Sequence, residues 1–550
     1  MKKLWLILSL GMIGLTADAQ FGPSPYQVPT GLVHGAAFRD LIRPIPLVNG
    51  LDAGEWGAEG VRPREAQNGL EDTTWSYWCT SGIRGPDGRE HLFVCRWRED
   101  SPKGHREWPR SLLARAVSDS PTGPFTVVQE IGPGHNAEVY QAKDGTYVVY
   151  VINNSYQAKS LEGPWTPVKL QFDLRGLKAV DMSNCTFARR EDGSFLMVSR
   201  TGEIWVSPDG LRPYLRLSDG SVYPAIKGAF EDPVVWRDEV QYHLIVNDWY
   251  GRTAYYLRSD DGVHWVWDAG KAYDQDVVRH PDGKIEQWHK LERPKVRQDE
   301  YGRATHLYLA GVDVAKEEDF GSDQHSSKSL VLPLTVGRRL AVLGEGSLDA
   351  STRVVRVEIR AEPGFDPLAE VAVDSLAFGG VAAVNFGRGA RAIKSEKVGA
   401  NLVVSFAGSG LELGADDFAA KLLGRTRGGD LLFGYARLPG RTSLAPLLRT
   451  RVPTLARLEN GSLRAELTLE NFGQVAAGET ALALTFLRAG QELCTTTLLA
   501  PGVAPYAATQ VVANVNSPAL VAGETVDVRV VVDPDAQRPA RRQTPGLVLP

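Results

Sequence analysis

Apolar and polar residues alternate with a period of two over much of the chain, in short segments rich in Val, Tyr, Phe and Trp. Such alternation is typical of β-strands, because successive side chains of a strand point to opposite faces of the sheet. Sustained helical periodicity is absent from residues 70 to 335. The pattern therefore predicts an all-β protein.

A repeated unit fills the first two thirds of the chain. Each copy ends with a short strand, a Ser-led turn and an aromatic residue, in the segments ARAVSDSPTGPF (114–125), YQAKSLEGPW (156–165), IWVSPDGLRPY (204–214) and YYLRSDDGVHW (255–265). A hairpin precedes each ending, with Asp-Gly turns at Asp87, Asp144 and Asp192, and a fifth copy begins near Glu292. Five such units predict a five-bladed β-propeller, which closes on itself and leaves few strand edges exposed. An Ig-like sandwich is the alternative architecture, but five copies of one pattern count against it.

The composition changes near residue 336, where Trp disappears and Ala, Leu, Val and Gly become dominant. We therefore expect the propeller to span residues 20–335 and to be followed by one or two β-sandwich domains. Alternating segments predict a β-sandwich over residues 336–440 and an Ig-like β-sandwich over 441–535. Residues 536–550 are predicted to be a disordered tail.

The N-terminus has the pattern of a secretory signal. Two lysines precede an apolar run that ends at Leu15, and Ala17 and Ala19 frame a cleavage site before Gln20. Removal of residues 1–19 would place the protein in a secreted or periplasmic location. No later segment approaches about 18 uninterrupted apolar residues, so no membrane span is predicted. A net charge of -5 with interspersed signs provides no basic surface for nucleic acid.

Only 4 cysteines occur, which excludes a disulfide-rich scaffold. Cys79 and Cys95 lie at equal distances from Asp87 on either side of a hairpin turn, where they could face each other and form a disulfide. Two buried free thiols are the other reading, because directly opposed strand positions often have poor disulfide geometry.

Polar residues gather at the starts of the innermost strands of the expected propeller. In such a fold these starts meet around one axis although they lie far apart in the sequence. They carry His135, Asn136, Glu138, Asp181, Asn184, Glu231, Asp232, Glu292 and Arg293. Several carboxyl groups around one cavity suit glycoside hydrolysis, in which one carboxyl donates a proton while another, ionised, activates water or attacks the sugar. Crowded like charges raise one pKa and a cation such as Arg293 lowers another, which separates the two roles.

Asp232, Glu292, Glu138 and Asp181 are the candidate catalytic residues. A proline follows Asp232 and marks it as a strand start. The segment HNAEVY aligns with this strand in two ways, one that pairs Glu138 with Asp232 and one that pairs Asn136 with Asp232. A slip of this kind changes which side chain faces the axis. Each candidate also has a structural alternative, in which it satisfies turn backbone or forms an ion pair.

The remaining polar and aromatic residues of this region are candidates for sugar binding: His135, Asn136, Glu231, Arg293, Trp78, Asp72 and Asn184. His135 could bind sugar or donate a proton, and a packed structural histidine fits the pattern equally well. Trp78 could stack on a sugar ring, although core packing is the commoner role of such aromatics. Asp72 is the candidate carboxylate of the first unit, and Asp40 is a weaker one.

Motifs for other chemistry are absent from the sequence. GxSxG, HExxH, P-loop and strand-following GxGxxG sequences do not occur, and the histidines show no ligand spacing. We expect no cofactor and no metal site, with a Ca²⁺ ion on the axis as the one option, because carboxylates near an axis can hold it.

At HNAEVY, FEDPVVW and LERPKV, together with the SxxGPW and SxDGxxW endings, the chain resembles the five-bladed propeller glycosidases, in particular glycoside hydrolase family 43 and its relatives. The resemblance covers roughly residues 30 to 335. It implies hydrolysis of plant or algal polysaccharide side chains, with inversion, by an Asp base, a second Asp that tunes a pKa and a Glu acid from three different blades. By this resemblance Asp72 corresponds loosely to the base, Asp181 to the tuning residue, and Glu231 or Glu292 to the acid. The chain departs from the family pattern because its Asp-Pro pair lies in the fourth unit rather than the first.

The sequence thus predicts a secreted glycosidase that cleaves glycosidic bonds of plant or algal oligosaccharides or polysaccharides in the axial pocket. A non-catalytic carbohydrate-binding propeller is the alternative from a different class. A polysaccharide lyase or phosphorylase on the same scaffold is a third option.

Overall fold

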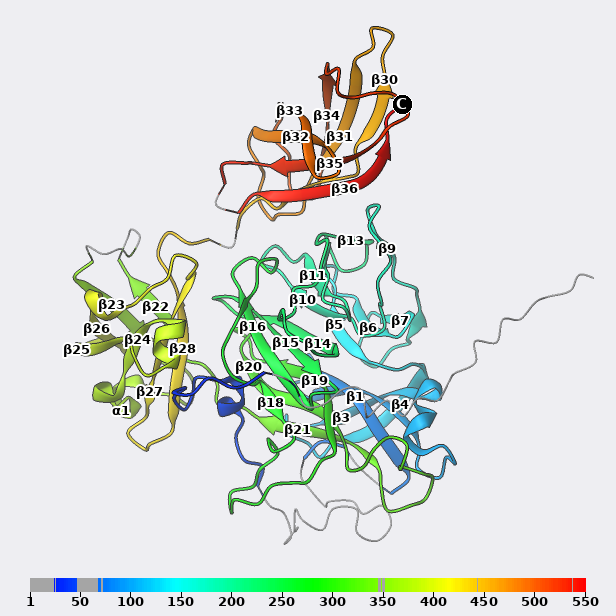
Figure 1. The fold of residues 1–550 in the computed structure, drawn as a ribbon. Helices are drawn as coiled ribbons and strands as arrows, with labels where there is room; N and C mark the ends of the chain where they lie inside the picture. Colours follow the sequence, from blue (N-terminus) through cyan, green and yellow to red (C-terminus); the bar gives the residue numbers. More distant parts are fainter. Residues whose placement is uncertain are drawn as a thin grey trace, which may run out of the picture.

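The structure, a computed structural model, describes residues 24, 26–46, 68–70, 73–344, 348, 352–442, 444–536 and 538–550 (Figure 1). The expected signal segment and Asp72 lie outside the described residues. Regular structure in the described part is almost entirely β-strand, as predicted, and its α-helices α1 (Pro367–Glu370) and α2 (Val381–Asn385) are short. No described helix is long and apolar enough to cross a membrane.

Residues 75 to 333 form five separate sheets, one for each copy of the sequence repeat. The first contains β1 (Trp75–Arg84), β2 (Glu90–Arg98), β3 (Leu112–Ser118) and β4 (Thr126–Pro133). The second contains β5 (Glu138–Gln141), β6 (Tyr147–Val151), β7 (Asn154–Ala158) and β8 (Thr166–Pro167). The third contains β9 (Phe172–Asp173), β10 (Thr186–Arg189), β11 (Phe195–Val198), β12 (Ile204–Ser207) and β13 (Tyr214–Arg216). The fourth contains β14 (Phe230–Arg237), β15 (Tyr242–Asp248), β16 (Thr253–Ser259), β17 (Val266–Trp267) and β18 (Tyr273–Asp274), and the fifth β19 (Lys290–Gln298), β20 (Ala304–Val312) and β21 (Ser327–Pro333).

The five sheets are arranged as a ring around one axis. Their first strands β1, β5, β10, β14 and β19 pack side by side in this order, and β19 returns to β1. Buried apolar clusters lie between neighbouring sheets; Trp78 and Val149, for example, belong to the cluster between the first two. Because each sheet buries its faces against its neighbours, the alternation of the sequence gives way to strands that are buried on both sides, such as β6 and β15.

The N-terminal segment joins the edge of the fifth sheet. Ile42 pairs with Leu334, Leu70 pairs with Ser329, and the backbone N–H of Arg43 donates to the carbonyl of Pro333 at 2.8 Å. The first described residues of the chain therefore contact the last strand of the ring.

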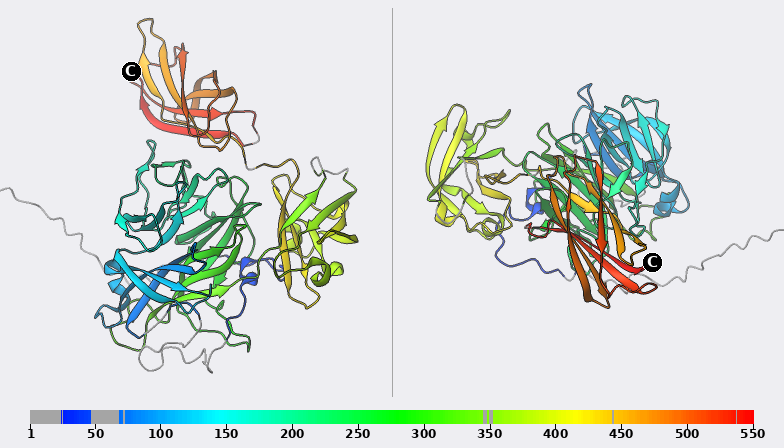
Figure 2. Two further views of the ribbon diagram at one scale, coloured as in Figure 1. Left: turned by 180° about the vertical axis from the view of Figure 1, so that it is seen from behind. Right: turned by 90° about the horizontal axis from the view of Figure 1, so that it is seen from above.

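The chain after the ring forms two further bodies, seen beside it in Figure 2. The first is one seven-stranded sheet with the order β22-β23-β26-β25-β24-β27-β28, where the sequence predicted a β-sandwich. Its strands are β22 (Leu340–Leu343), β23 (Val354–Ile359), β24 (Ala377–Gly380), β25 (Ala390–Val398), β26 (Asn401–Ala407), β27 (Ala419–Arg425) and β28 (Leu431–Arg437). They share one apolar cluster that includes Phe378 and Phe406.

The second body consists of two four-stranded sheets. One contains β29 (Leu448–Thr450), β30 (Thr454–Arg457), β31 (Leu463–Asn471) and β34 (Ala508–Val515); the other contains β32 (Thr480–Arg488), β33 (Gln491–Ala500), β35 (Thr525–Val532) and β36 (Ala540–Val548). Leu467 and Phe486 come from different sheets and belong to one buried cluster, so the two sheets pack against each other.

The predicted disordered tail is wrong, because residues 540–548 form β36, which pairs antiparallel with β35. The segment is polar, so its sequence does not indicate a strand. Its order comes from the backbone ladder and from the buried side chain of Arg542, which donates to the carbonyls of Thr450 at 3.0 Å and Arg175 at 3.2 Å.

Candidate active site

One side chain from the start of each first strand meets at the axis of the ring. The thiol of Cys79 donates to Oδ1 of Asn136 at 3.0 Å, and Nδ2 of Asn136 donates to Oδ1 of Asn184. Nδ2 of Asn184 donates to Oδ1 of Asp232 at 2.7 Å, and Arg293 donates to the same oxygen. The five residues form a central chain of hydrogen bonds that links all five sheets.

The backbone turns these side chains toward the axis. Cys79, Asn136, Asp232 and Arg293 have φ of 55°, 62°, 55° and 57°. The left-handed region is uncommon for residues other than Gly and Asn, and it coincides here with a shift of strand pairing in β1, β14 and β19. The shared conformation resolves the alignment that the sequence left open: Asn136, and not Glu138, is the equivalent of Asp232.

Three carboxyl groups crowd the end of the axis at which the first strands begin, which we call the mouth. Glu231 and Asp232 come from β14 and Glu292 from β19, and each offers an oxygen such that these oxygens lie within 4.8 Å of one another. The side chains of Asp232 and Glu292 are 1% exposed and that of Glu231 is 10% exposed. Glu231 is thus the carboxyl that faces outward.

Cations surround the three carboxyl groups. Arg200, in the β11–β12 connection, contacts Glu231 at 2.7 Å and Asp181 at 2.5 Å. Glu292 receives a hydrogen bond from Lys316 at 2.7 Å and lies 3.5 Å from the ammonium of Lys290. Asp181 is 40% exposed and lies beyond Arg200, so it contacts the mouth through this arginine.

The environments of Asp232 and Glu292 drive their pKa values apart. Burial raises the pKa of Asp232 to about 7, with Arg293 opposing the shift and the negative charges of Glu231 and Glu292 adding to it. Burial also acts to raise the pKa of Glu292, but Lys316 and Arg293 outweigh it, and the pKa is lowered. Near neutral pH the protonated form of Asp232 is therefore favoured relative to an ordinary aspartate, while Glu292 is ionised. Oδ2 of Asp232 is buried without a hydrogen-bond partner among the described residues, which suits a carboxyl oxygen that carries the proton.

The same three carboxyl groups could be read as ligands of a Ca²⁺ ion on the axis. Arg200 donates to Oε2 of Glu231, Lys316 to Oε2 of Glu292 and Asn184 to Oδ1 of Asp232, while Oδ2 of Asp232 and Oε1 of Glu292 have no hydrogen-bond partner among the described residues. Cations as close as Arg200 and Lys316 repel a divalent ion. The charges around the mouth therefore disfavour a resident axial metal.

Histidine and tryptophan side chains form another side of the mouth. Burial lowers the pKa of His135, whose Nδ1 is hydrogen-bonded to Ser111 at 2.8 Å, so the imidazole is neutral. Trp78 is 1% exposed and belongs to the core, with the Lys316 ammonium 5.1 Å from its ring centroid. Trp108 is 39% exposed and its ring lies 4.9 Å from that of His135, so Trp108 offers the aromatic face that the sequence assigned to Trp78.

The β20–β21 connection, which carries Lys316, also contains a carboxyl group in an unusual setting. Asp319 is 1% exposed, and neither of its carboxyl oxygens has a hydrogen-bond partner among the described residues. Burial raises the pKa of Asp319 to about 7, and the charge of Glu99 adds to the shift. Its carboxyl is therefore largely neutral in mildly acidic solution.

Glu138 lies apart from the mouth, in a deeper layer formed two residues after the central side chains. It pairs with Lys295 at 2.5 Å and accepts a hydrogen bond from the hydroxyl of Thr186 at 3.0 Å. Both Glu138 and Lys295 line a cavity of about 250 Å³. Within the described residues, the structure thus brings Asp232 and Glu292 together and places Glu138 behind them.

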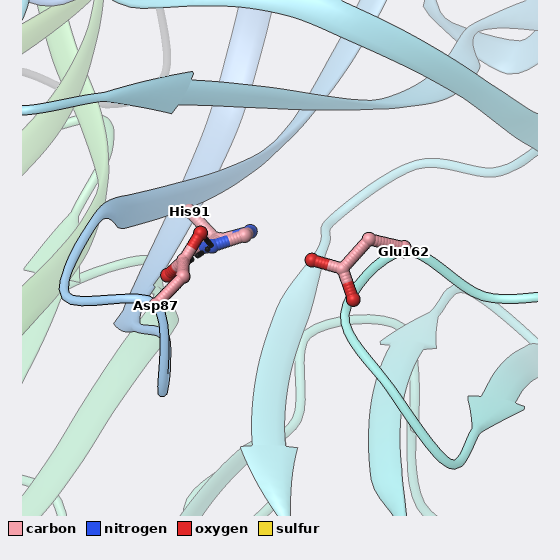
Figure 3. A group of neighbouring side chains, drawn as sticks. All are labelled: Asp87, His91 and Glu162. Carbon is pink, nitrogen blue, oxygen red and sulfur yellow. Dashed lines mark hydrogen bonds and ion pairs between the residues drawn. The ribbon is translucent and has the colours of Figure 1, made fainter.

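A second group of potential ligands, Asp87, His91 and Glu162, lies away from the axis (Figure 3). Arg115 lies 3.1 Å from Nδ1 of His91, and as a permanent donor it requires Nδ1 to accept. Nε2 then carries the hydrogen and donates to Asp87 at 3.1 Å. The imidazole has no lone pair left for a metal at this position.

Cys79 and Cys95 are both free and buried. The partner of Cys95 across the hairpin is Trp78, because the bulge in β1 displaces Cys79 by one position. Burial raises the pKa of the Cys79 thiol well above its ordinary value, so it is a neutral donor to Asn136.

Sequence reasoning did not identify Cys79, Arg200, Lys316 and Trp108 as parts of this region. Arg200, Lys316 and Trp108 belong to connections between second and third strands, which follow no common pattern. The signal that could have found them is position, since these connections and the starts of the first strands lie at the same end of antiparallel sheets.

Solved structures similar to this chain include glycoside hydrolases. The catalytic domain of a Coprinopsis cinerea GH62 alpha-L-arabinofuranosidase matches at 12% identity and a TM-score of 0.35, covering 50% of this chain and 96% of that chain. A GH43B from a Bacteroides ovatus xyloglucan locus matches at 11% and 0.33, covering 86% and 90%, and a GH43 protein from Bacillus licheniformis at 11% and 0.31, covering 86% and 89%. No family model and no curated protein matches the chain. All three matches have TM-scores below 0.5 and identities of 11% or 12%.

Proposed function

We propose that this protein is a secreted glycoside hydrolase, in which a five-bladed β-propeller carries the active site and is followed by the seven-stranded sheet and the two-sheet body. The observation that carries the proposal is the crowding of Glu231, Asp232 and Glu292 at the mouth, with one carboxyl favoured in its protonated form and another held ionised. Pairs of carboxyl groups with separated pKa values are what acid-assisted cleavage of a glycosidic bond requires.

In this proposal Asp232 is the acid and Glu292 the nucleophile. Retaining enzymes hold their two carboxyl groups roughly 5 to 5.5 Å apart, and oxygens of the mouth carboxyls within 4.8 Å of one another are close enough for this arrangement. The Glu292 carboxylate attacks the anomeric carbon while Asp232 gives its proton to the leaving oxygen, so one C–O bond forms as another breaks. Asp232 then takes a proton from a water that attacks the same carbon, which releases the sugar and restores both carboxyl groups.

The outer groups of the mouth would hold the sugar. Glu231 and Arg200 offer charged hydrogen-bonding groups to its hydroxyls, and Trp108 offers an aromatic face. Lys316, which covers Glu292, must move aside when the substrate enters. The polysaccharide class, plant or algal, and export by cleavage after residue 19 are parts of the same proposal.

The test is a screen of purified protein against aryl glycosides and plant and algal oligosaccharides, followed by Asp232→Asn and Glu292→Gln on the best substrate. We expect both variants to lose turnover while Glu130→Gln, an exposed carboxyl on β4, keeps it. Nuclear magnetic resonance of the first-formed anomer would show retention. Turnover unchanged in both mouth variants would refute the site, and an ultraviolet-absorbing or phosphorylated product would identify a lyase or a phosphorylase instead.

One observation favours a second candidate, a non-catalytic sugar-binding protein. Asp232 and Glu292 are deeply buried and paired with Arg293 and Lys316, as structural ion pairs are. Calorimetric binding of an oligosaccharide that wild-type protein never cleaves would support this role.

A further inference from the structure

A cavity of about 380 Å³ lies between the ring and the seven-stranded sheet, and on β14 it is lined by Trp236, at the other end of the strand from Glu231 and Asp232. Its walls come from β14, β15 and β16, from the β19–β20 turn, from the connection after β21, and from β28. Ligand sites of about this size occur preferentially between domains. Arg339 of the connection pairs with Glu239 of the β14–β15 turn at 2.8 Å, so charged contacts already join the two bodies here.

The lining combines aromatic rings with an excess of positive charge. Its aromatic residues are Phe38, Trp236, Tyr256, Tyr301, Phe433 and Tyr435. Its ionic residues are Arg303, Arg338, Arg339, Arg360 and Arg437 against Asp238 and Glu239, that is, five arginines and two carboxylates. A site with this composition attracts an anion with a ring-shaped body.

Most of the lining charges are already paired. Arg303 contacts Asp299 at 2.8 Å, Arg360 donates to Glu358 at 3.1 Å, and Arg437 donates to the carbonyl of Val240 at 2.7 Å. These groups shape the cavity without needing a ligand.

Arg338 is the exception. Its guanidinium lies 3.7 Å from the ring centroid of Phe365, and its side chain makes no hydrogen bond or close ion pair with any described residue. The five N–H donors of a guanidinium match a carboxylate in a two-pronged geometry. Arg338 is therefore a preorganised anion-binding group that lacks its acceptor.

We propose that this cavity is a second ligand site, which binds a carboxylate carried on a six-membered ring, with Arg338 holding the carboxylate and the aromatic walls contacting the ring. Two sources share this chemistry, a uronic acid residue of a glycan and an aromatic acid. The site is independent of the proposed catalysis, because none of its lining residues belongs to the mouth.

The experiment is calorimetric titration of the full chain with methyl β-D-glucuronide, 4-hydroxybenzoate and, as the uncharged control, methyl β-D-glucoside. We expect at least one acid to bind with a Kd of about 1 mM or tighter, and the glucoside at least about tenfold more weakly. Tighter binding of the glucuronide identifies the glycan source, and tighter binding of 4-hydroxybenzoate the aromatic source.

Arg338→Gln should weaken acid binding by at least about tenfold, with Arg338→Lys intermediate because an ammonium keeps the charge but not the fork. Arg356→Gln, an exposed arginine of the same sheet paired with Glu396, is the matched control and should bind as wild type does. If Arg338→Gln fails to fold, Arg338→Met serves as the second variant and should weaken acid binding by a similar factor. Binding unchanged in Glu292→Gln would separate this site from the mouth. No binding of either acid at about 10 mM, or undiminished binding by a folded Arg338→Gln, would overturn the proposal.

Discussion

The mouth and the deeper layer of the axis are built from the same five strands, two residues apart, yet their charges are arranged differently. Among the described residues, the deeper layer holds one acid, Glu138, which is paired with Lys295 at 2.5 Å. At the mouth three carboxyl groups also contact cations, but their oxygens approach one another within 4.8 Å. The comparison teaches that acids on a propeller axis are not by themselves a sign of chemistry. The mouth differs from a structural ion pair because its carboxyl groups are crowded, and crowding raises the pKa of one of them so that it keeps a proton.

The largest expected effect is a difference in turnover between a variant of the mouth and a variant of the deeper layer. Glu292→Gln should lower kcat/KM on the best substrate by at least about 10³-fold, because it removes the ionised carboxylate of the pair. Glu138→Gln should lower it by less than about tenfold, because Glu138 does not reach the substrate. Steady-state kinetics of both folded variants would check this, and equal losses would show that the two layers are not functionally distinct.

The free energy of unfolding should depend strongly on Glu138, although turnover should not. Glu138→Gln leaves the buried ammonium of Lys295 without its counter-charge, and we expect it to cost about 3 kcal/mol in the free energy of unfolding. Lys295→Met should cost a similar amount, and the double variant should recover most of the loss. Urea unfolding of the three proteins measures these values; additive losses would contradict a direct pair.

Asp319 offers a smaller test on the segment that carries Lys316. Because the pKa of Asp319 is raised to about 7 in the folded state, its contribution to stability is complete below its ordinary value near 4 and is lost as the pH rises through about 7. We expect Asp319→Asn to unfold with a flatter pH dependence, and its stability relative to wild type to be about 2 to 3 kcal/mol greater at pH 8 than at pH 5. Parallel curves for the two proteins would show that this carboxyl ionises as an ordinary one does.

The smallest expected effect concerns the pH dependence of activity. With Asp232 as the acid, kcat/KM should fall as the pH rises above about 7, since the proton is then lost. Arg293 holds that pKa down, so Arg293→Gln should move the alkaline limb upward by about one pH unit or more. Arg293→Lys is the matched control, and its limb should stay near that of wild type. A limb that does not move in Arg293→Gln would assign the titration to another group.

The repeat and its Asp-Gly turns were readable in the sequence because they depend on local turn chemistry. The glycines after Asp87, Asp144 and Asp192 have φ of 79°, 87° and 82°, a conformation that Gly adopts at little cost. The predicted strand starts likewise brought Asn184, Asp232 and Arg293 to one axis.

The sequence did not show which side chains face the axis, because the left-handed backbone conformation that turns Asn136 inward has no clear sequence signal. For this reason the sequence left open whether Asn136 or Glu138 is the equivalent of Asp232, and Glu138 ranks below Asp232 and Glu292 as a candidate. The same limitation hid the cations, since Arg200 and Lys316 come from connections whose sequences share nothing. The polar strand β36 was missed because backbone pairing and Arg542, rather than an apolar pattern, hold it in place.

Ile42 pairs with Leu334 and Leu70 with Ser329, so the ring is closed by contacts between the N-terminal segment and the last strand region of the ring. A ribosome makes the first of these segments long before the last. While the chain grows, the first sheet keeps an uncovered flank that only the fifth sheet can fill, and contacts between such distant segments form slowly. Partly synthesised chains of this protein are therefore the form most prone to associate wrongly. This risk ends when the segment around residue 334 leaves the ribosome and can pair with the N-terminal segment.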